Sequence, residues 1–206
     1  IKGKGAPKKL KDVEYTIIPD RIVAGTYMVA SGITGGEVTI KNIIPEHLAS
    51  VVSVLNEAGC KIKAYNNQIH IFGPERPEAV DIIRTLPYPG FPTDMQAPLV
   101  ALLTIAKGTS IVIETVFENR YKHVDELMRM GANITLEGRI AVIKGVDRLK
   151  GAFVYARDLR GAASLVLAGL AAEGETVINE IKHLDRGYEN IEEKLSSLGA
   201  LVKREA

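Results

Sequence analysis

The chain has 206 residues, with 26 basic and 25 acidic side chains and a net charge of +1, so its length fits one large domain or two small ones. Hydrophobic residues make up 46% and charged residues 25%, which is typical of a globular protein and excludes a global charge that would attract nucleic acid or anionic lipid. One cysteine excludes an internal disulfide framework, and no apolar stretch approaches the ~20 residues of a membrane span, so we predict a cytoplasmic protein without nucleic-acid or membrane partners.

Residues 13–72 form the first of three similar units. Short β-branched runs alternate with longer amphipathic runs, as expected when strands and helices follow one another. The pair Asn66-Asn67 tolerates the positive φ of a tight turn and predicts a hairpin. In chain order we predict a strand at 13–19, a helix at 22–34, a strand at 37–42, a helix at 46–58 and the hairpin at 61–72.

Two further units follow, at about 79–145 and 152–206. The second is predicted to contain a strand at 79–86, a helix at 96–108, a strand at 110–116, a helix at about 121–130 and a hairpin at 133–145 that turns at Glu137-Gly138. The third is predicted to contain a strand at 152–158, a helix at 162–174, a strand at 175–181 and a helix at about 188–198. The sequence ends where the third hairpin is due, so we expect either a strand from elsewhere to complete that unit or the unit to close imperfectly.

Glycines mark equivalent points of the three units. The first helix of each unit ends at Gly36, Gly108 or Gly174, and the second ends at Gly59, Gly131 or Gly199. The distances between the paired glycines are 23, 23 and 25 residues. Such regular spacing indicates one supersecondary module used three times, and functional side chains at equivalent ends could then converge on one face.

The hydrophobic pattern also predicts how the modules pack. The helices at 96–108 and 162–174 are apolar nearly all round, which is typical of helices enclosed by protein. Residues 133–144 instead alternate, as in a sheet with one wet face. We therefore predict a mixed α/β fold in which each unit has the order β-α-β-α-β-β, with helices inside and sheets outside.

Three aspartates open the first helices of the units: Asp20, Asp94 and Asp158. An aspartate in that place usually caps the helix by accepting backbone N–H bonds. It could also orient a substrate hydroxyl or take its proton. The stiff loop before Asp94, with Pro87, Pro89, Gly90 and Pro92, favours a functional role for Asp94.

Arg120, Arg160 and Arg186 lie where a strand end or loop meets a helix, and Arg120 and Arg186 are equivalent in the repeat. Each could be a surface arginine paired with Glu118, Asp158 or Asp185. Together they could clamp a phosphate or carboxylate, because the planar guanidinium group binds such anions through two hydrogen bonds.

The sequence gives little support for nucleophilic or metal chemistry. Cys60 corresponds to Ala132 and Ala200 in the other units, so we interpret it as a small residue that fills space. The four histidines, His47, His70, His123 and His183, lack metal-ligand spacing. The chain also lacks a glycine-rich nucleotide loop and a serine nucleophile elbow.

Several long motifs resemble one family. They are PDRIVAGTYMVA, FPTDMQA, ETVFENRYKHVDEL, RDLRGAASLVLAGLAAEGET and HLDRGYENIEEKL. In this order and register they resemble the carboxy-terminal half of the UDP-N-acetylglucosamine 1-carboxyvinyltransferase family of enolpyruvyl transferases, from about Tyr15 to Arg204.

The resemblance implies a lobe built from three β-α-β-α-β-β units as an inside-out α/β barrel. It assigns residues 1–14 to the tail of another lobe and the crossover, and residues 15–206 to a carboxy-terminal lobe. The implied partner is an amino-terminal lobe of the same enzyme, whose first strand pairs back into this one. Since the chain begins at Ile1 rather than Met, we expect it to be part of a longer polypeptide.

The resemblance also implies a reaction: transfer of the enolpyruvyl group of phosphoenolpyruvate to the 3-hydroxyl of UDP-N-acetylglucosamine, through a tetrahedral intermediate and without a metal or cofactor. Asp94 matches the sugar-contacting aspartate and candidate base. Val116 matches a position whose backbone contacts the nucleotide sugar. The remaining matches are Arg120 and Arg186 as ligands of phosphoenolpyruvate and phosphate, Asp158 and Arg160 as a cleft-lining segment, and Asp20 as a hinge-side aspartate.

The family's reactive cysteine belongs to the other lobe, and Cys60 does not correspond to it. Half of the substrate clamp is therefore absent, so we expect the chain alone to be inactive. Two alternatives remain open. One is a lobe of the shikimate-pathway enolpyruvyl transferase, and the other is a non-catalytic module that binds phosphate or a nucleotide.

Overall fold

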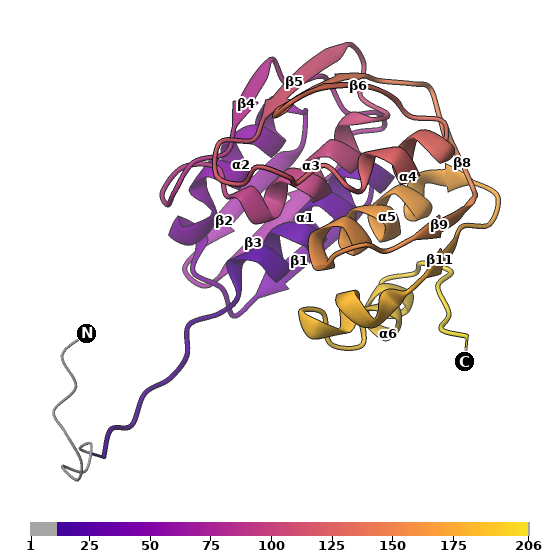
Figure 1. Ribbon diagram of the computed structural model, residues 1–206. Helices are drawn as coiled ribbons and strands as arrows, with labels where there is room; N and C mark the ends of the chain where they lie inside the picture. Colours follow the sequence, from indigo (N-terminus) through magenta and orange to yellow (C-terminus); the bar gives the residue numbers. More distant parts are fainter. Residues whose placement is uncertain (1–11, 206) are drawn as a thin grey trace, which may run out of the picture.

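The first unit folds much as its sequence predicts. In the computed structural model, which describes residues 12–205, α1 (Arg21–Thr34) leads into a three-stranded antiparallel sheet of order β1-β3-β2 (Figure 1). Strand β3 (Gln68–Phe72) lies between β1 (Glu37–Lys41) and β2 (Lys61–Tyr65). A 3-10 helix, η1 (Pro45–Leu48), runs directly into α2 (Ala49–Glu57).

The second unit contains the complete element order. Its four-stranded sheet has the order β4-β5-β7-β6, with β4 parallel to β5 and the other neighbours antiparallel. The helices that alternate with these strands are η2, α3 and α4. The bounds are β4 (Ile82–Arg84), η2 (Thr93–Met95), α3 (Gln96–Leu103), β5 (Thr109–Ile113), α4 (Val124–Arg129), β6 (Asn133–Glu137) and β7 (Ile140–Lys144).

The third unit has the parallel pair but no hairpin among the described residues. Strand β9 (Phe153–Tyr155) pairs with β11 (Val177–Asn179), and a short pair joins β8 (Leu149–Lys150) to β10 (Ala172–Glu173). Helix α5 (Leu159–Ala171) follows β9. The helices after β11 are η3 (Ile181–Arg186) and α6 (Ile191–Ser197).

The first helices of the three units form the centre of the molecule. Helices α1, α3 and α5 pack against one another, and Figure 1 shows them enclosed by the strands and outer helices. Every residue of α3 is buried, which explains why its sequence is apolar on all sides. In β7, Ala141 and Ile143 are buried while Ile140, Val142 and Lys144 are exposed, so this sheet has one wet face. The prediction of inner helices and outer sheets is confirmed.

Two local predictions are wrong. Residues 13–19 are not a strand: they pair with no other segment within residues 12–205, their side chains are exposed, and the segment leads away from the body of the protein (Figure 1). The alternating sequence is suited to a strand, but a strand also needs a hydrogen-bonding neighbour.

The second hairpin turns at Gly138-Arg139, one residue later than predicted, and Gly138 takes the positive φ of 56°. The assignment of residues 1–14 to a crossover stays a prediction, and residues 1–11 lie outside the described part.

Backbone geometry supports the repeat. Gly59, Gly131 and Gly199 have φ values of 93°, 94° and 97°, so the second helix of every unit ends in the same left-handed conformation. After the hairpins, the N–H of Gly73 donates to Gly36 O at 2.8 Å and that of Gly145 donates to Gly108 O at 3.0 Å. The first two units are therefore closed by equivalent hydrogen bonds.

Gly145 is expected to tolerate no side chain. A Cβ atom there would lie 1.7 Å from the carbonyl oxygen of Ala106, whereas one at Gly131 would meet nothing within 4 Å. Gly145→Ala should therefore lower the free energy of unfolding by about 3 kcal/mol or more, because backbone must move. Gly131→Ala should lower it by about 1–2 kcal/mol through its positive φ alone. Urea unfolding of both variants checks the order, and equal losses would contradict it.

Candidate functional site

Asp94 is positioned by a loop that is hydrogen-bonded to itself. The N–H of Gly90 donates to Pro87 O and that of Leu86 donates to Phe91 O, each at 2.8 Å. The loop then enters η2, in whose first turn Asp94 lies. Unlike the other two aspartates, Asp94 caps no helix, so its carboxylate is available for side-chain partners.

The carboxylate of Asp94 joins two arginines from different units. Its Oδ1 accepts a hydrogen bond from Arg120 Nη2, and its Oδ2 accepts one from Arg160 Nη2 at 3.1 Å. The Arg120 and Arg160 side chains are 19% and 12% exposed, and that of Asp94 is 37% exposed. Arg120 also stacks over the ring of Phe117, 4.7 Å from its centroid. We call Asp94, Arg120 and Arg160 the Asp94 cluster.

The Asp94 cluster has the charge needed to hold an anion. Two guanidinium groups share one carboxylate, so one positive charge is in excess at a partly buried place. Charge-assisted hydrogen bonds from such groups favour phosphate or carboxylate ligands. The carboxylate itself can also accept a hydrogen bond from a hydroxyl group, because each of its oxygens has a second acceptor site beside the one used by an arginine. The cluster therefore combines an anion-binding charge with a potential proton acceptor.

Arg186 does not join the cluster directly. Its side chain is exposed and has no ion pair or hydrogen bond within residues 12–205. A Cβ atom on the next residue, Gly187, would lie 2.9 Å from the side chain of Leu159, so this segment approaches the start of α5 that carries Arg160. Two guanidinium groups are thus gathered with Asp94, and the third lies on an adjoining segment.

The surface pairs considered for these arginines are wrong. Glu118 pairs with Arg139 at 3.3 Å, and Asp185 pairs with Arg204 at 2.7 Å. Asp158 is used for capping instead of an ion pair. The sequence had placed the arginines near these acidic neighbours, whereas Asp94 lies 26 and 66 residues away from its two partners.

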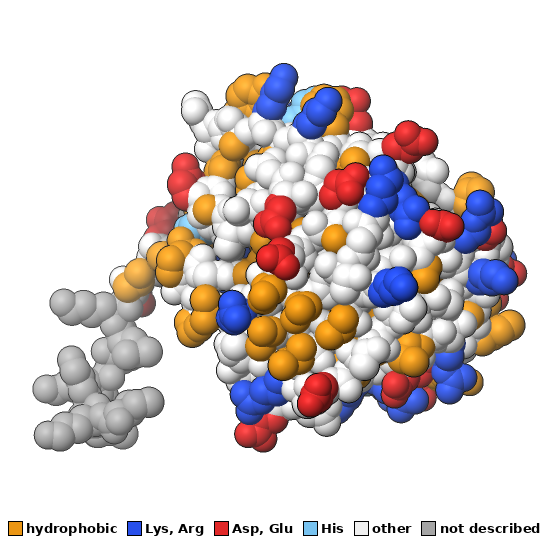
Figure 2. All heavy atoms as spheres, turned by 90° about the horizontal axis from the view of Figure 1, so that it is seen from above, with side chains coloured by type: hydrophobic (Ala, Val, Ile, Leu, Met, Phe, Trp, Pro, Cys, Tyr) orange, Lys and Arg blue, Asp and Glu red, His pale blue; other side chains and the backbone are white. Residues whose placement is uncertain are grey.

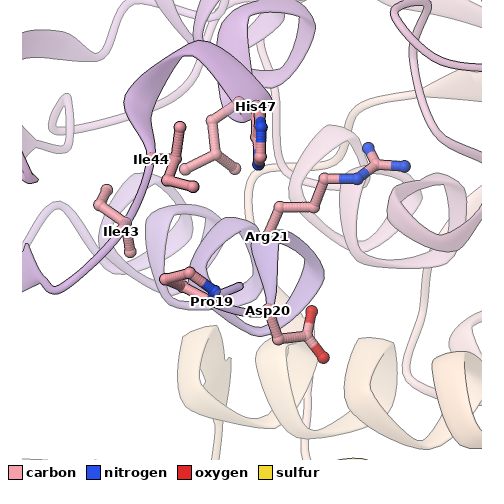
Figure 3. Close-up of a pocket in the computed structure, with 7 residues that line it drawn as sticks. Pro19, Asp20, Arg21, Ile43, Ile44 and His47 are labelled. Carbon is pink, nitrogen blue, oxygen red and sulfur yellow. The ribbon is translucent and has the colours of Figure 1, made fainter. Parts of the chain in front are cut away.

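Asp20 and Asp158 are confirmed as helix caps. Asp20 accepts from the backbone N–H groups of Ile22 and Val23 at the start of α1, and Asp158 accepts from those of Arg160 and Gly161 at the start of α5. Figure 3 shows Asp20 beside a shallow hollow lined by Pro19, Ile43, Ile44 and His47, with the Arg21 side chain extending away from its carboxylate. At the start of α5, the hydrogen bond from the Arg160 N–H to Asp158 fixes the backbone of Arg160.

Glu114 holds the loop that contains Val116. Its buried carboxylate accepts from the backbone N–H groups of Val116 and Phe117, at 2.8 and 3.1 Å, and from the hydroxyls of Thr85 and Thr93, each at 2.8 Å. The Val116 N–H is therefore engaged, and only its carbonyl oxygen is left to accept from a ligand. Glu114 received no role from the sequence, although a charged residue inside the apolar strand predicted at 110–116 was a signal.

Cys60 behaves as a space-filling residue. It is buried, and burial raises the pKa of its thiol to about 11, so it is not a thiolate near neutral pH. Within residues 12–205 no group of three His, Cys, Asp or Glu side chains is arranged to hold a metal ion.

His123 lies behind the cluster in a fully buried place. Neither ring nitrogen has a partner in the described structure, and the side chain of Gln96 is also buried without partners. Loss of solvation lowers the pKa of His123 to about 4, while Asp158 opposes the shift and Arg120 adds to it. The ring is therefore neutral at pH 7.

His123 should make folding sensitive to acid. Its pKa is near 6.5 in the unfolded chain and about 4 when folded, so the unfolded state binds more protons between these values. Above pH 6.5 the His123 side chain does not change the free energy of unfolding. Between pH 7 and pH 5 it should lower the free energy of unfolding by about 2 kcal/mol. Urea unfolding of His123→Gln should lack this loss, and that of the control His47→Gln should keep it. An unchanged pH dependence in His123→Gln would contradict the expectation.

Figure 2 shows the distribution of charge on one face of the protein. Acidic and basic side chains are interspersed there, together with a group of hydrophobic ones, and no continuous basic area is visible. The basic residues at 2–11 lie outside the described part. None of the helices in residues 12–205 has the length and apolar character needed to cross a membrane.

Sequence comparison supplies the family. Residues 1–195 match the family model described as EPSP synthase (3-phosphoshikimate 1-carboxyvinyltransferase). The chain belongs to the EPSP synthase family. This confirms the resemblance to enolpyruvyl transferases found in the motifs.

Curated relatives within this family are more specific. A protein of Caldanaerobacter subterraneus subsp. tengcongensis, UDP-N-acetylglucosamine 1-carboxyvinyltransferase 2, is 57% identical over 96% of this chain and 47% of its own length. UDP-N-acetylglucosamine 1-carboxyvinyltransferase of Thermodesulfovibrio yellowstonii is 52% identical over 99% of this chain and 49% of its own. The chain spans about half the length of these relatives.

Solved structures confirm the fold. The enolpyruvyl transferase NikO of Streptomyces tendae matches 92% of this chain and 45% of its own with a TM-score of 0.83 and 26% identity. EPSP synthase of Acinetobacter baumannii matches 93% of this chain and 45% of its own with a TM-score of 0.71 and 22% identity, which supports the fold alone. The chain therefore has the architecture of one lobe of an enolpyruvyl transferase.

Proposed function

We propose that the chain is the carboxy-terminal lobe of an enzyme that transfers the enolpyruvyl group of phosphoenolpyruvate to the 3-hydroxyl of UDP-N-acetylglucosamine, a step in peptidoglycan precursor synthesis. The observation that carries the proposal is the Asp94 cluster, which sets a carboxylate between two partly buried guanidinium groups. The names of relatives at 52–57% identity support the choice of substrates.

Each proposed role has a physical basis. Asp94 accepts the proton of the sugar hydroxyl as the sugar oxygen bonds to the central carbon of phosphoenolpyruvate, whose methylene carbon gains a proton. The methyl group of the resulting tetrahedral adduct then gives up a proton while the bond between the central carbon and the phosphate oxygen breaks. The C=C double bond of the enolpyruvyl group re-forms, and inorganic phosphate leaves. Arg120 and Arg186 hold the phosphate and carboxylate groups of phosphoenolpyruvate.

The remaining residues shape the same cleft. Asp158 fixes the start of α5, from which Arg160 reaches Asp94. Val116 offers its carbonyl oxygen to the nucleotide sugar, because Glu114 engages its N–H. Asp20 caps α1, and a hinge-side role for it stays a prediction. An amino-terminal lobe completes the clamp around both substrates, and the reaction takes place in the cytoplasm without a cofactor.

The proposal is tested by phosphate release from phosphoenolpyruvate in the presence of UDP-N-acetylglucosamine. The chain alone should release none, because catalysis requires both reactants to be positioned together. The chain joined to the other lobe should release phosphate only when both substrates are present. Release with shikimate 3-phosphate in place of the nucleotide sugar would favour the shikimate-pathway alternative. Binding of both substrates to the two-lobe protein without release would favour the non-catalytic module.

A further inference from the structure

A pair of buried hydroxyl groups lies behind Arg160. Arg160 Nη1 donates a hydrogen bond to Tyr188 Oη at 3.1 Å, and Tyr188 Oη is 2.8 Å from Thr26 Oγ1. Thr26 and Tyr188 are each only 2% exposed. The guanidinium carbon of Arg160 also lies 5.7 Å from the centroid of the Tyr188 ring. Arg160 is therefore held on one side by Asp94 and on the other by tyrosine.

One arrangement of donors and acceptors makes all the hydrogen bonds of this series at the same time. Thr26 has a single hydroxyl hydrogen, which it donates to the carbonyl oxygen of Ile22 at 2.9 Å. Thr26 Oγ1 must then accept the hydrogen of Tyr188. The Tyr188 oxygen is left with its lone pairs, and one of them accepts from Arg160, which can only donate. The series therefore runs from arginine to tyrosine to threonine to the backbone of α1.

These residues connect all three units. Thr26 belongs to α1, Asp94 to η2, Arg160 to α5, and Tyr188 follows η3. The guanidinium group of Arg160 lies between two hydrogen-bond acceptors, the charged carboxylate of Asp94 and the neutral hydroxyl of Tyr188. Arginine side chains have many rotamers, so an acceptor on each side removes the conformations that would point away from Asp94. Tyr188 also lies two residues after Arg186, so its buried ring anchors that segment as well.

We propose that Tyr188 and Thr26 are positioning residues that set the orientation of the Arg160 guanidinium group beside Asp94. This inference rests on the proposed function for its catalytic consequence. Without the tyrosine hydroxyl, Nη1 of a mostly buried guanidinium loses its acceptor, and the group can rotate out of the geometry that an anionic substrate requires.

Kinetics of the two-lobe enzyme provide the first test. Tyr188→Phe and Thr26→Val should each lower kcat/KM for phosphoenolpyruvate about tenfold or more, the usual effect of losing a hydrogen bond to a charged group. Thr26→Ser keeps the hydroxyl and should stay within about twofold of the wild type. The double variant should lose little more than either single one, because both interrupt the same series. The matched control is Tyr27→Phe, since Tyr27 packs against the buried cluster that contains Tyr188 and has no hydrogen bond to the arginine.

The second test uses the 206-residue chain itself and does not need turnover. In arginine-labelled protein, the guanidinium signals of Arg160, assigned with Arg160→Lys, should show slow rotation about the Nε–Cζ bond. Rotation should become several-fold faster in Tyr188→Phe and Thr26→Val and stay unchanged in Tyr27→Phe. If the two-lobe enzyme has no turnover, the proposed function fails while this measurement still decides the positioning role. Unchanged rotation in Tyr188→Phe, with or without a loss of thermal stability, would show a purely structural tyrosine and overturn the inference.

Discussion

Replacing Asp94 by asparagine is expected to lower kcat of the two-lobe enzyme by about 10²- to 10⁴-fold, the usual contribution of a positioned general base. The amide has nearly the same shape, and its oxygen can still accept from one arginine, so the fold should persist. It cannot take the proton of the sugar hydroxyl. Phosphate release at saturating concentrations of both substrates measures the effect.

A matched control separates this role from the loss of an ion pair. Asp147 pairs with Arg76 at 2.7 Å on the surface, and 85% of its side chain is exposed. Asp147→Asn removes the same charge from an aspartate–arginine pair and should leave turnover unchanged. If Asp94→Asn retained more than a third of wild-type turnover while remaining folded, Asp94 would not be the base.

The periodic part of the fold was predictable because glycine is required at its joints. Only a residue without a side chain adopts φ near 95° at little cost, so Gly59, Gly131 and Gly199 recur wherever the second helix ends. The burial of α3 was predictable as well, because a helix that is apolar on all sides is stable only when protein surrounds it. The segment at 13–19 was mispredicted because its sequence shows the alternation of polar and apolar residues, but not whether another strand lies beside it to pair with.

The site was predictable as a set of residue types but not as a set of contacts. The motifs identified Asp94, Arg120 and Arg160, yet their mutual pairing depends on how three units pack around α1, α3 and α5. Reasoning from neighbours in sequence paired the arginines with the wrong carboxylates. Thr26 and Tyr188 are 162 residues apart, and a threonine among the apolar residues of α1 was the only local signal for their contact.

Replacing Glu114 by alanine should lower the free energy of unfolding more than any other substitution considered for the site. Glu114→Ala leaves two backbone N–H groups and two threonine hydroxyls without their acceptor, of which the Thr85 hydroxyl is buried and the others are partly buried. We expect the free energy of unfolding to fall by about 3–5 kcal/mol, because unsatisfied buried donors lose their hydration without compensation and a cavity is added. Urea unfolding of the 206-residue chain measures this loss.

Glu114→Gln is the control for that variant, because it removes the negative charge and keeps an acceptor oxygen. Its carbonyl oxygen can take the place of Oε1 and serve Val116, Phe117 and Thr85, while its new N–H₂ group can donate to the Thr93 hydroxyl, which is free to reorient. The glutamine variant should therefore lose no more than about 1 kcal/mol. Equal losses in both variants would show that the negative charge, rather than the acceptor geometry, holds the loop. The predicted difference would instead mean that Glu114 holds the loop at Val116 through the geometry of its acceptor oxygens.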